Sequence, residues 1–311
     1  METKNEPLAG AREPVAYSPI TTPSEPASTL FFGPDGLRSG WRFLCYIMLA
    51  AAVAMVLNFT LHRIIHHKLP QIWGDSLGEL VALAVAFLPA LIMARFERRS
   101  FGVYGLPAHG AFGNNFGIGA IWGFIAISVL LLAIRGVGDF SITGLALHGA
   151  RVFKFAIFWA VFFLCVGFFE EFLFRGYTQF TLTQGIGFWP AAAVLSLMFG
   201  AAHSGNGGEN KVGLFAVVMI AFFFCLTLRR TGTLWFAVGF HAAFDWGESY
   251  FFSVPDSGSL SPGHLLNSSF TGSHWITGGS AGPEGSVFVL LLIVLLCVVF
   301  DRLYPEVKYH S

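Results

Sequence analysis

The sequence predicts an all-α, polytopic integral membrane protein with about eight transmembrane helices and a buried polar site. Hydrophobic residues make up 55% of the 311 residues, and the mean hydropathy is +0.66. Charged residues make up 12%, against about 25% in a typical soluble domain. The apolar residues are gathered in runs that are long enough to cross about 30 Å of hydrocarbon as helices. These observations favour one polytopic membrane domain over two soluble domains.

The chain is expected to begin with a flexible tail at residues 1–40. This segment is rich in Pro, Glu, Ser and Thr and shows no apolar periodicity, so it cannot bury enough apolar surface to become ordered. It does not resemble a secretory signal, because the first apolar run begins beyond residue 40 and no cleavable small-residue site follows it. We expect the transmembrane domain at residues 41–303 and a second, short tail at residues 304–311.

Eight apolar runs are expected to cross the membrane. In chain order they are Phe43–Leu61, Leu77–Met93, Phe116–Ile134, Phe155–Phe180, Trp189–His203, Val212–Leu228, Leu234–Phe252 and Val287–Leu303. The fourth run is continuous only if it carries a pair of glutamates within it. Between the last two runs, residues 253–285 are dense in Ser and Gly, and they are predicted to form an exposed loop.

The Lys and Arg residues near the helix ends predict the orientation of the chain. On the side of the N-terminus lie Arg38, Arg42, Arg95, Arg98, Arg99, Arg229, Arg230, Arg302 and Lys308. On the other side lie Arg63, Lys68, Arg135, Arg151, Lys154 and Lys211. Because positive side chains are enriched on the cytoplasmic side, both termini are predicted to be cytoplasmic, with the protein in the cell (plasma) membrane.

Charge balance and cysteine positions exclude several classes of protein. Eighteen Lys and Arg residues balance eighteen Asp and Glu residues, so no basic surface indicates nucleic-acid binding. The four cysteines all lie in apolar runs and have no CxxC spacing. The sequence therefore predicts neither a disulfide framework nor a thiolate metal site.

Three charged residues lie inside the apolar stretch FFEEFLFRGY, namely Glu170, Glu171 and Arg175. If they acted independently, inserting them would cost about 8–10 kcal/mol, at roughly 2.5–3.5 kcal/mol each. Glu171 and Arg175 are about 40° apart around a helix, so they are predicted to form a salt bridge. Glu170 lies about 140° from Arg175 and is left for another role. An interfacial charge cluster that closes a helix end is the structural alternative, but apolar residues on both sides argue against it.

Two histidines also lie within apolar runs. His203 follows Phe199 by four residues, and His241 precedes Asp245 by four. A single histidine on an apolar face is usually a structural core residue. Two such histidines on separate helices, one of them with an acid on its own face, favour a functional site shared with the glutamate pair.

Three motifs, in this order on three predicted membrane helices, resemble those of the CPBP family: E-E-x-x-x-R at Glu170, Glu171 and Arg175, F-x-x-x-H at Phe199 and His203, and H-x-x-x-D at His241 and Asp245. This family comprises the type II CAAX prenyl endopeptidases and the bacterial bacteriocin-processing and Abi-type membrane proteases. The stretches TGTLWFAVGFHAAFDW and ERRSFGVYGLP also resemble family segments, so the resemblance covers a core at about residues 95–250. Many family members end the third motif with Asn, where this chain has Asp245.

The resemblance implies an intramembrane endopeptidase that hydrolyses a peptide bond near the membrane through an activated water. In this interpretation Glu170 is the general base, His203 holds and polarises the water, and His241 faces the oxyanion or binds a metal. Glu171 and Arg175 would support Glu170. The substrate class implied is CAAX-type or leader-peptide-type.

A metal requirement stays open. His203, His241 and Glu170 have the ligand types of a three-ligand catalytic zinc site, but the chain has no H-E-x-x-H motif. A metal-free Glu/His water mechanism fits the same residues. An ionised Asp245 cannot donate to an oxyanion as Asn would, so it would have to be protonated, orient His241, or ligate a metal. Phe199 is expected to pack beside His203.

Two other classes of function are alternatives to a protease. A non-enzymatic transporter or proton relay also uses intramembrane Glu, Arg and His, but the sequence shows no internal repeat of the kind many transporters have. An immunity or scaffold protein would keep the same buried polar cluster without turnover. For the protease, the expected partners are a protein or peptide substrate, lipidated or not, and the lipid bilayer. Its oligomeric state is left open.

Overall fold

The computed structural model describes residues 28–33, 36–65, 69–208 and 210–309. Of the tail predicted at residues 1–40, residues 1–27 lie outside the described part of the chain. The chain divides into two compact units, Met1–Arg38 and Ser39–Ser311. In the first unit, the short helix α1 (Ser28–Phe31) is followed by the strands β1 (Phe32–Gly33) and β2 (Gly36–Leu37), which pair antiparallel.

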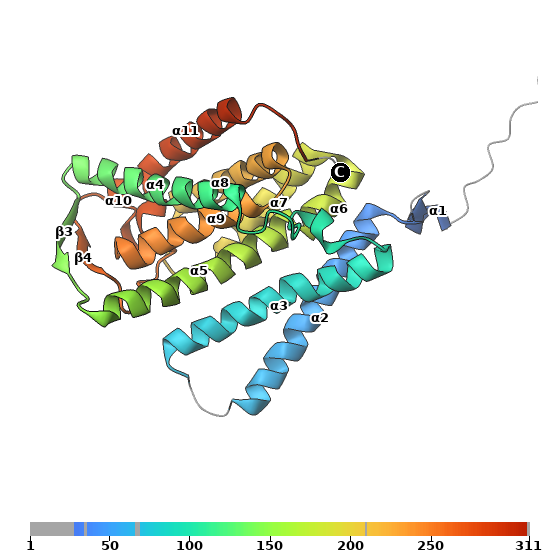
Figure 1. The fold of residues 1–311 in the computed structure, drawn as a ribbon, viewed down its shortest axis with the longest axis horizontal. Helices are drawn as coiled ribbons and strands as arrows, with labels where there is room; N and C mark the ends of the chain where they lie inside the picture. The colour runs from blue at the N-terminus through green and yellow to red at the C-terminus, as the bar shows by residue number, and fades with distance from the viewer. Residues whose placement is uncertain (1–27, 34–35, 66–68, 209, 310–311) are drawn as a thin grey trace, which may run out of the picture. The chain divides into compact units, whose positions relative to one another are not determined.

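The second unit is built from helices, with one small sheet (Figure 1). Its helices are α2 (Ser39–Ile64), α3 (Gln71–Glu97), α4 (Asn114–Gly136), α5 (Ala150–Arg175), α6 (Tyr177–Ile186), α7 (Phe188–His203), α8 (Lys211–Thr231), α9 (Trp235–Asp245), α10 (His274–Thr277) and α11 (Val287–Leu303). Each of the eight predicted apolar runs overlaps at least one of these helices. The all-α class predicted from the sequence is therefore confirmed.

Five helical segments among the described residues are long and apolar enough to cross a membrane. They are Ser39–Ile64, Gln71–Glu97, Asn114–Gly136, Ala150–Ile186 and Lys211–Thr231. The fourth segment bends at Gly176, where α5 ends and α6 begins. The remaining predicted runs overlap α7, α9 and α11, which are shorter helices of 16, 11 and 17 residues.

Glycines bring α4 and α9 into direct backbone contact. A methyl group added at Gly119 or Gly123 of α4 would lie 2.1 Å from a backbone carbonyl oxygen of α9, and one at Gly239 would lie 2.2 Å from the carbonyl of Phe116. Such close approach between membrane helices is possible only where side chains are absent. The glycines thus fix the position of α9, which carries His241 and Asp245.

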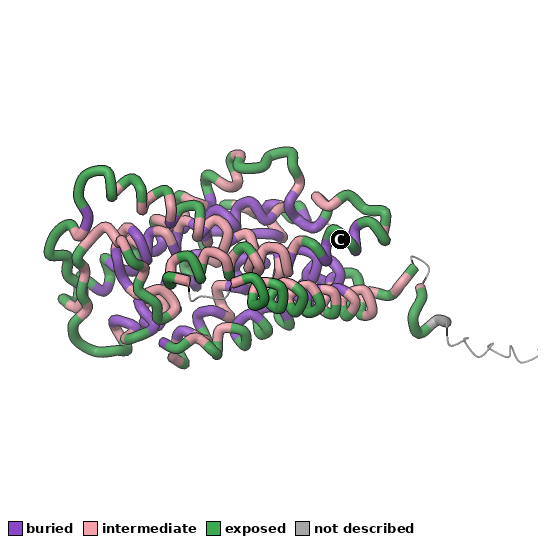
Figure 2. Tube along the Cα trace, turned by 90° about the horizontal axis from the view of Figure 1, so that it is seen from below, coloured by how far each residue is buried: buried purple, intermediate pink, exposed green. Residues whose placement is uncertain are grey.

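Aromatic side chains fill the core between α4, α8, α9 and α11. Phe236 and Phe300 have ring centroids 4.8 Å apart, and those of Phe223 and Phe240 are 5.6 Å apart. Figure 2 shows the buried residues in the middle of the helical unit, while its outer helices are mostly exposed or intermediate. Since these outer faces are apolar, they suit contact with hydrocarbon rather than water.

The segment at residues 253–285 differs from the exposed loop that its composition predicts. Strand β4 (Leu266–Phe270) pairs antiparallel with β3 (Phe140–Leu145), which joins α4 to α5. Val254 and Ala281 are each only 1% exposed. The prediction of exposure is wrong for these parts, because small residues let the segment pack against the ends of the helices instead of extending into solvent.

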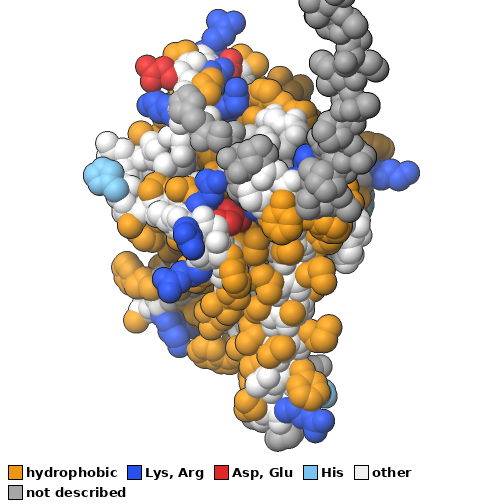
Figure 3. Space-filling view, turned by 90° about the vertical axis from the view of Figure 1, so that its right-hand side faces the viewer, with side chains coloured by type: hydrophobic (Ala, Val, Ile, Leu, Met, Phe, Trp, Pro, Cys, Tyr) orange, Lys and Arg blue, Asp and Glu red, His pale blue; other side chains and the backbone are white. Residues whose placement is uncertain are grey.

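Four of the basic residues assigned to the N-terminal side of the membrane, Arg42, Arg99, Arg229 and Lys308, share contacts or a pocket. Arg42 in α2 donates to Glu97 at the end of α3 over 3.2 Å. The backbone N–H of Lys308 donates to the carbonyl of Arg229 over 3.0 Å, and Arg99 and Lys308 line one pocket. On this end of the molecule, Lys and Arg side chains form patches among hydrophobic ones (Figure 3). The cytoplasmic location of this side stays a prediction.

Adding a side chain at the α4–α9 contact should destabilise the protein. Gly119→Val would force two backbones apart, and overpacking of this kind costs about 1–3 kcal/mol or more. We expect a lower melting temperature in detergent for this variant. Gly117→Val is the matched control on the same helix, since a methyl at Gly117 meets nothing within 4 Å. Equal melting temperatures for the two variants would contradict the role given to the close contact.

Candidate functional site

The four residues predicted to be catalytic line one cavity of about 670 Å³. Glu170 comes from α5, His203 from the end of α7, and His241 and Asp245 from α9. Helices α3, α8 and α11 supply further walls. Side chains on separate membrane helices thus meet in one polar space inside an apolar fold.

Glu170 is the carboxylate that approaches both histidines. Its Oε2 lies 3.6 Å from Nε2 of His241 and 3.9 Å from Nε2 of His203. The Glu170 side chain is 19% exposed, compared with 0% for Glu171. Glu170 is therefore the member of the glutamate pair that a molecule in the cavity can reach.

The ring orientation of His203 is set by its own helix. Its Nδ1 lies 2.8 Å from the backbone carbonyl of Phe199. Because a carbonyl only accepts hydrogen bonds, Nδ1 must carry the hydrogen. In the neutral imidazole, Nε2 then has a free lone pair directed toward Glu170. The Phe199 ring also packs against the imidazole, with centroids 4.4 Å apart.

The His241 ring is held by a contact that the sequence does not predict. Its Nδ1 donates to Oε1 of Glu171 over 2.9 Å. The opposite nitrogen, Nε2, lies 3.4 Å from Oδ2 of Asp245, in addition to its approach to Glu170. The ring of Phe224 stacks on the imidazole at 5.7 Å and 10°. His241 therefore has one nitrogen fixed by Glu171 and the other presented to the cavity.

The ion pair expected between Glu171 and Arg175 is present, with 3.3 Å between Oε1 and Nη1. Both side chains are removed from solvent, at 0% and 1% exposure. The Arg175 guanidinium also lies 4.4 Å from the centre of the Phe199 ring, in a cation–π contact. Glu171 thus contacts His241 and Arg175, which makes it a positioning residue rather than a cavity residue.

The backbone changes character immediately after Asp245. Helix α9 ends there, and residues Trp246–Phe251 form a π-helical turn. Such turns are rare and occur frequently at functional sites. Ser249 within this turn also lines the cavity.

Several cavity residues were missed by the sequence interpretation. Asp75 and Glu79 of α3 line the cavity, as do Asp256 and Glu284 from the segment after α9. The four-residue spacing of Asp75 and Glu79, at the start of an apolar run, was a signal that places both on one helix face. No pattern marks Asp256 or Glu284, since they lie in a Ser- and Gly-rich segment.

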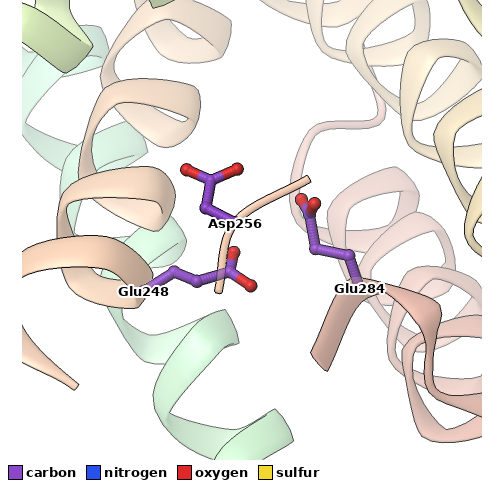
Figure 4. Close-up of side chains that lie close together, drawn as sticks. All are labelled: Glu248, Asp256 and Glu284. Atoms are coloured by element: carbon purple, nitrogen blue, oxygen red, sulfur yellow. The ribbon is translucent and has the colours of Figure 1, made fainter. Parts of the chain in front are cut away.

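Glu248, Asp256 and Glu284 form a group of acidic side chains beside the cavity. One carboxylate oxygen from each lies within 4.8 Å of the others, and the three side chains come from three different segments (Figure 4). Burial raises the pKa of Asp256 to about 6, although the Ser249 hydroxyl donates to it over 3.0 Å. Oxygen ligands of this kind suit hard divalent cations. Among the described residues, this acidic group is the set whose three potential ligand atoms all lie within 4.8 Å of one another. The ring nitrogens of His203 and His241 and the carboxylate of Glu170 do not meet that condition together.

The two histidines and Glu170 nevertheless match a zinc-binding donor set in their chemistry. Zinc-binding histidines usually donate from the second ring nitrogen to a carboxylate or a backbone carbonyl. His241 donates to Glu171 in this way, and His203 to the Phe199 carbonyl. Both Nε2 atoms are thereby directed to Glu170, so the donor types fit a metal at this position.

The fold and the site define a membrane protein of many helices with a Glu/His/His centre between them. Residues 152–247 match the family described as type II CAAX prenyl endopeptidase, Rce1-like. This range contains all three motifs, so the resemblance to the CPBP family is confirmed for this part of the chain. None of the curated proteins compared with the chain matches it.

Replacing Glu171 should affect both the stability of the fold and the orientation of His241, and a second substitution can separate these two effects. Glu171→Gln leaves the Arg175 charge buried without its partner, and breaking one side of a buried pair typically costs about 3–5 kcal/mol. The melting temperature should fall, and His241 should lose its fixed orientation. The double variant Glu171→Gln/Arg175→Met should regain melting temperature, because no unpaired charge is left.

That double variant should not regain any activity that depends on His241, because its Nδ1 still lacks the carboxylate. Thermal unfolding in detergent and the cleavage assay described below measure the two effects on the same preparations. Full activity in the double variant would show that Glu171 acts only through stability.

Proposed function

We propose that this protein is an intramembrane endopeptidase in which Glu170, His203 and His241 activate a water molecule for peptide-bond hydrolysis. The observation that carries the proposal is that both imidazole Nε2 atoms lie within 3.9 Å of one Glu170 oxygen in a single cavity. The family match supports a peptidase in general. We further propose that the protein acts in the cell membrane with both termini in the cytoplasm, on the basis of its Lys and Arg distribution.

Glu170 is the proton carrier of the proposed reaction. Its carboxylate takes a proton from the water, and the resulting hydroxide oxygen bonds to the carbonyl carbon of the substrate. The protonated Glu170 then gives this proton to the amide nitrogen as the carbon–nitrogen bond breaks. One water is consumed, and an amine and a carboxylic acid are formed.

The two histidines have different tasks because their hydrogen bonds differ. His203 has its hydrogen on Nδ1, so its Nε2 accepts the second hydrogen of the water and orients the oxygen. His241 uses its Nδ1–H on Glu171, so it donates to the developing oxyanion from Nε2 in its protonated form. Asp245, 3.4 Å from the same nitrogen, orients that imidazole.

Zinc bound by His203, His241 and Glu170 would supply a Lewis acid and a more acidic water at the same place. In that case Glu171 and the Phe199 carbonyl would orient the two histidine ligands, as they do in the structure. We favour the metal-free form, because neither α7 nor α9 supplies a pair of strong zinc ligands. An assay with a chelator separates the two forms.

The cavity suits a peptide substrate with apolar parts. Val217 and Ile220 of α8 and Val289 and Leu292 of α11 form an apolar wall in the same cavity as the catalytic set. A lipidated C-terminal peptide and an apolar leader peptide both match this wall. A transporter or scaffold function would leave such peptides intact.

Glu170→Gln should abolish cleavage and leave the fold intact. The amide keeps the shape of the side chain but cannot take a proton, and a general base contributes about 10²–10⁴-fold to the rate. The measurement is cleavage of a prenylated peptide and of a leader-peptide library by purified protein in liposomes. An unchanged melting temperature is the control. Near-normal turnover in this variant would make Glu171 the candidate base.

Asp245→Asn should distinguish the metal-free mechanism from a metal-dependent one. Without a metal, the neutral amide donates beside His241, and activity should be kept or raised. If Asp245 holds a metal directly or through His241, the substitution weakens metal binding, and activity should fall unless Zn²⁺ is supplied. Turnover is measured with and without a chelator. A chelator-sensitive loss of activity would overturn the metal-free form.

A further inference from the structure

One face of α3 lies on the cavity of the proposed active site. The residues on it are Gln71, Gly74, Asp75, Gly78 and Glu79. Their spacing of three and four residues places them on a single side of the helix. Helix α3 packs against α5, the helix that carries Glu170 (Figure 1). A polar face of a membrane-spanning helix thus borders the same space as the proposed base.

The fold does not account for the two carboxylates on this face. Glu79 Oε2 is inaccessible to solvent and has no hydrogen-bond partner among the described residues. Among the residues that the structure describes, neither Asp75 nor Glu79 forms an ion pair with a Lys or Arg side chain. Asp75 lies near the start of α3, where the helix dipole favours a negative charge, but Glu79 is two turns into the helix and beyond that effect. A carboxylate at such a position in a membrane helix indicates a function.

The glycines beside the carboxylates leave open space. A methyl group added at Gly74 or Gly78 would meet nothing within 4 Å, and neither residue has a positive φ angle. Packing and backbone conformation therefore do not require glycine here, although glycine destabilises a helix interior relative to alanine. The missing side chains make room in the cavity directly beside Asp75 and Glu79.

Apart from His203 and His241, the ionisable side chains that line the cavity are all acidic. Carboxylates come from Asp75, Glu79, Glu170, Asp245, Asp256 and Glu284, and no Lys or Arg is among the lining residues that the structure describes. A low-dielectric space lined in this way attracts cations and repels anions. The apolar wall from α8 and α11 accommodates the uncharged parts of the same ligand.

We propose that Asp75 and Glu79 bind the positively charged side chain of a Lys or Arg residue in the peptide substrate, close to the bond that is cleaved. This inference rests on the proposed protease function and adds a specificity-determining surface to it. A basic side chain would extend over Gly74 and Gly78 to reach the two carboxylates. A peptide with an uncharged residue at that position would leave Oε2 of Glu79 without a partner, which is how a polar site rejects a substrate lacking the matching group.

The test compares two fluorescent peptides that differ only by Lys or norleucine, with the position of this residue moved along the peptide in a series. Affinity is measured by fluorescence anisotropy with full-length protein in nanodiscs, without any need for turnover. The wild-type protein should bind the best Lys peptide at least about 10-fold more tightly than its norleucine counterpart. Glu79→Gln should remove this difference and leave the affinity for the norleucine peptide unchanged. Glu306→Gln, an exposed acid 77% accessible to solvent, is the matched control and should keep the preference.

Two further variants keep the test valid if Glu79→Gln folds poorly. Glu79→Arg should reverse the preference toward a peptide with Glu in place of Lys. Gly78→Leu keeps both carboxylates but fills the adjacent space, so it should weaken binding of the Lys peptide. The melting temperature of each variant is measured on the same preparation.

Equal affinities of the wild-type protein for the Lys and norleucine peptides at every position would overturn the proposal. A Lys preference that persists in Glu79→Gln and Asp75→Asn would also overturn it. Selective binding of the Lys peptide without its cleavage would contradict only the proposed protease function and would leave the role of Asp75 and Glu79 in place. Cleavage without a Lys preference would contradict only the role given to Asp75 and Glu79.

Discussion

The buried ion pair between Glu171 and Arg175 is the interaction on which the site depends. Both charges are shielded from water, so neither can be left alone without a large loss of stability. Glu171 also accepts from His241, and Arg175 lies over the ring of Phe199, which packs against the imidazole of His203. One ion pair on α5 thus orients the imidazoles of α7 and α9 by two separate routes. This explains why two adjacent glutamates have different environments: one is buried as a structural anion, and the other faces the cavity.

The orientation of His241 is useful only if α9 itself is held at a defined position among the helices. The backbone contact between α4 and α9, made through Gly119, Gly123 and Gly239, sets the position of α9 along α4 by shape rather than by polar bonds. Polar bonds would be less selective here, because hydrogen bonds between membrane helices contribute only modestly to stability. The site therefore combines two kinds of constraint. Close packing positions the helices, and charge pairing then orients the side chains.

The sequence predicted the features that depend on local spacing. All eight predicted apolar runs are helical over most or all of their length or overlap a helix, and the pair at positions 171 and 175 follows from helix geometry alone. The contact between Glu171 and His241 was not predictable, because it depends on the distance and rotation between α5 and α9. The same holds for Asp75 and Glu79, whose place on the cavity is decided by the packing of α3. The exposure predicted for residues 253–285 was wrong for a different reason. Small polar residues can pack closely against other segments as readily as they can face solvent.

Two carboxylates approach one nitrogen in this site, and that arrangement constrains its chemistry. Nε2 of His241 lies 3.6 Å from Glu170 and 3.4 Å from Asp245. Two carboxylates so close to one point repel each other when both are ionised, unless a positive charge lies between them or one of them is protonated. A protonated imidazole supplies that charge in the metal-free form, and a metal ion bound at the nitrogen supplies it in the other. An asparagine at position 245 would not impose this requirement. The aspartate therefore links the protonation or metal content of His241 directly to the charge of the proposed base.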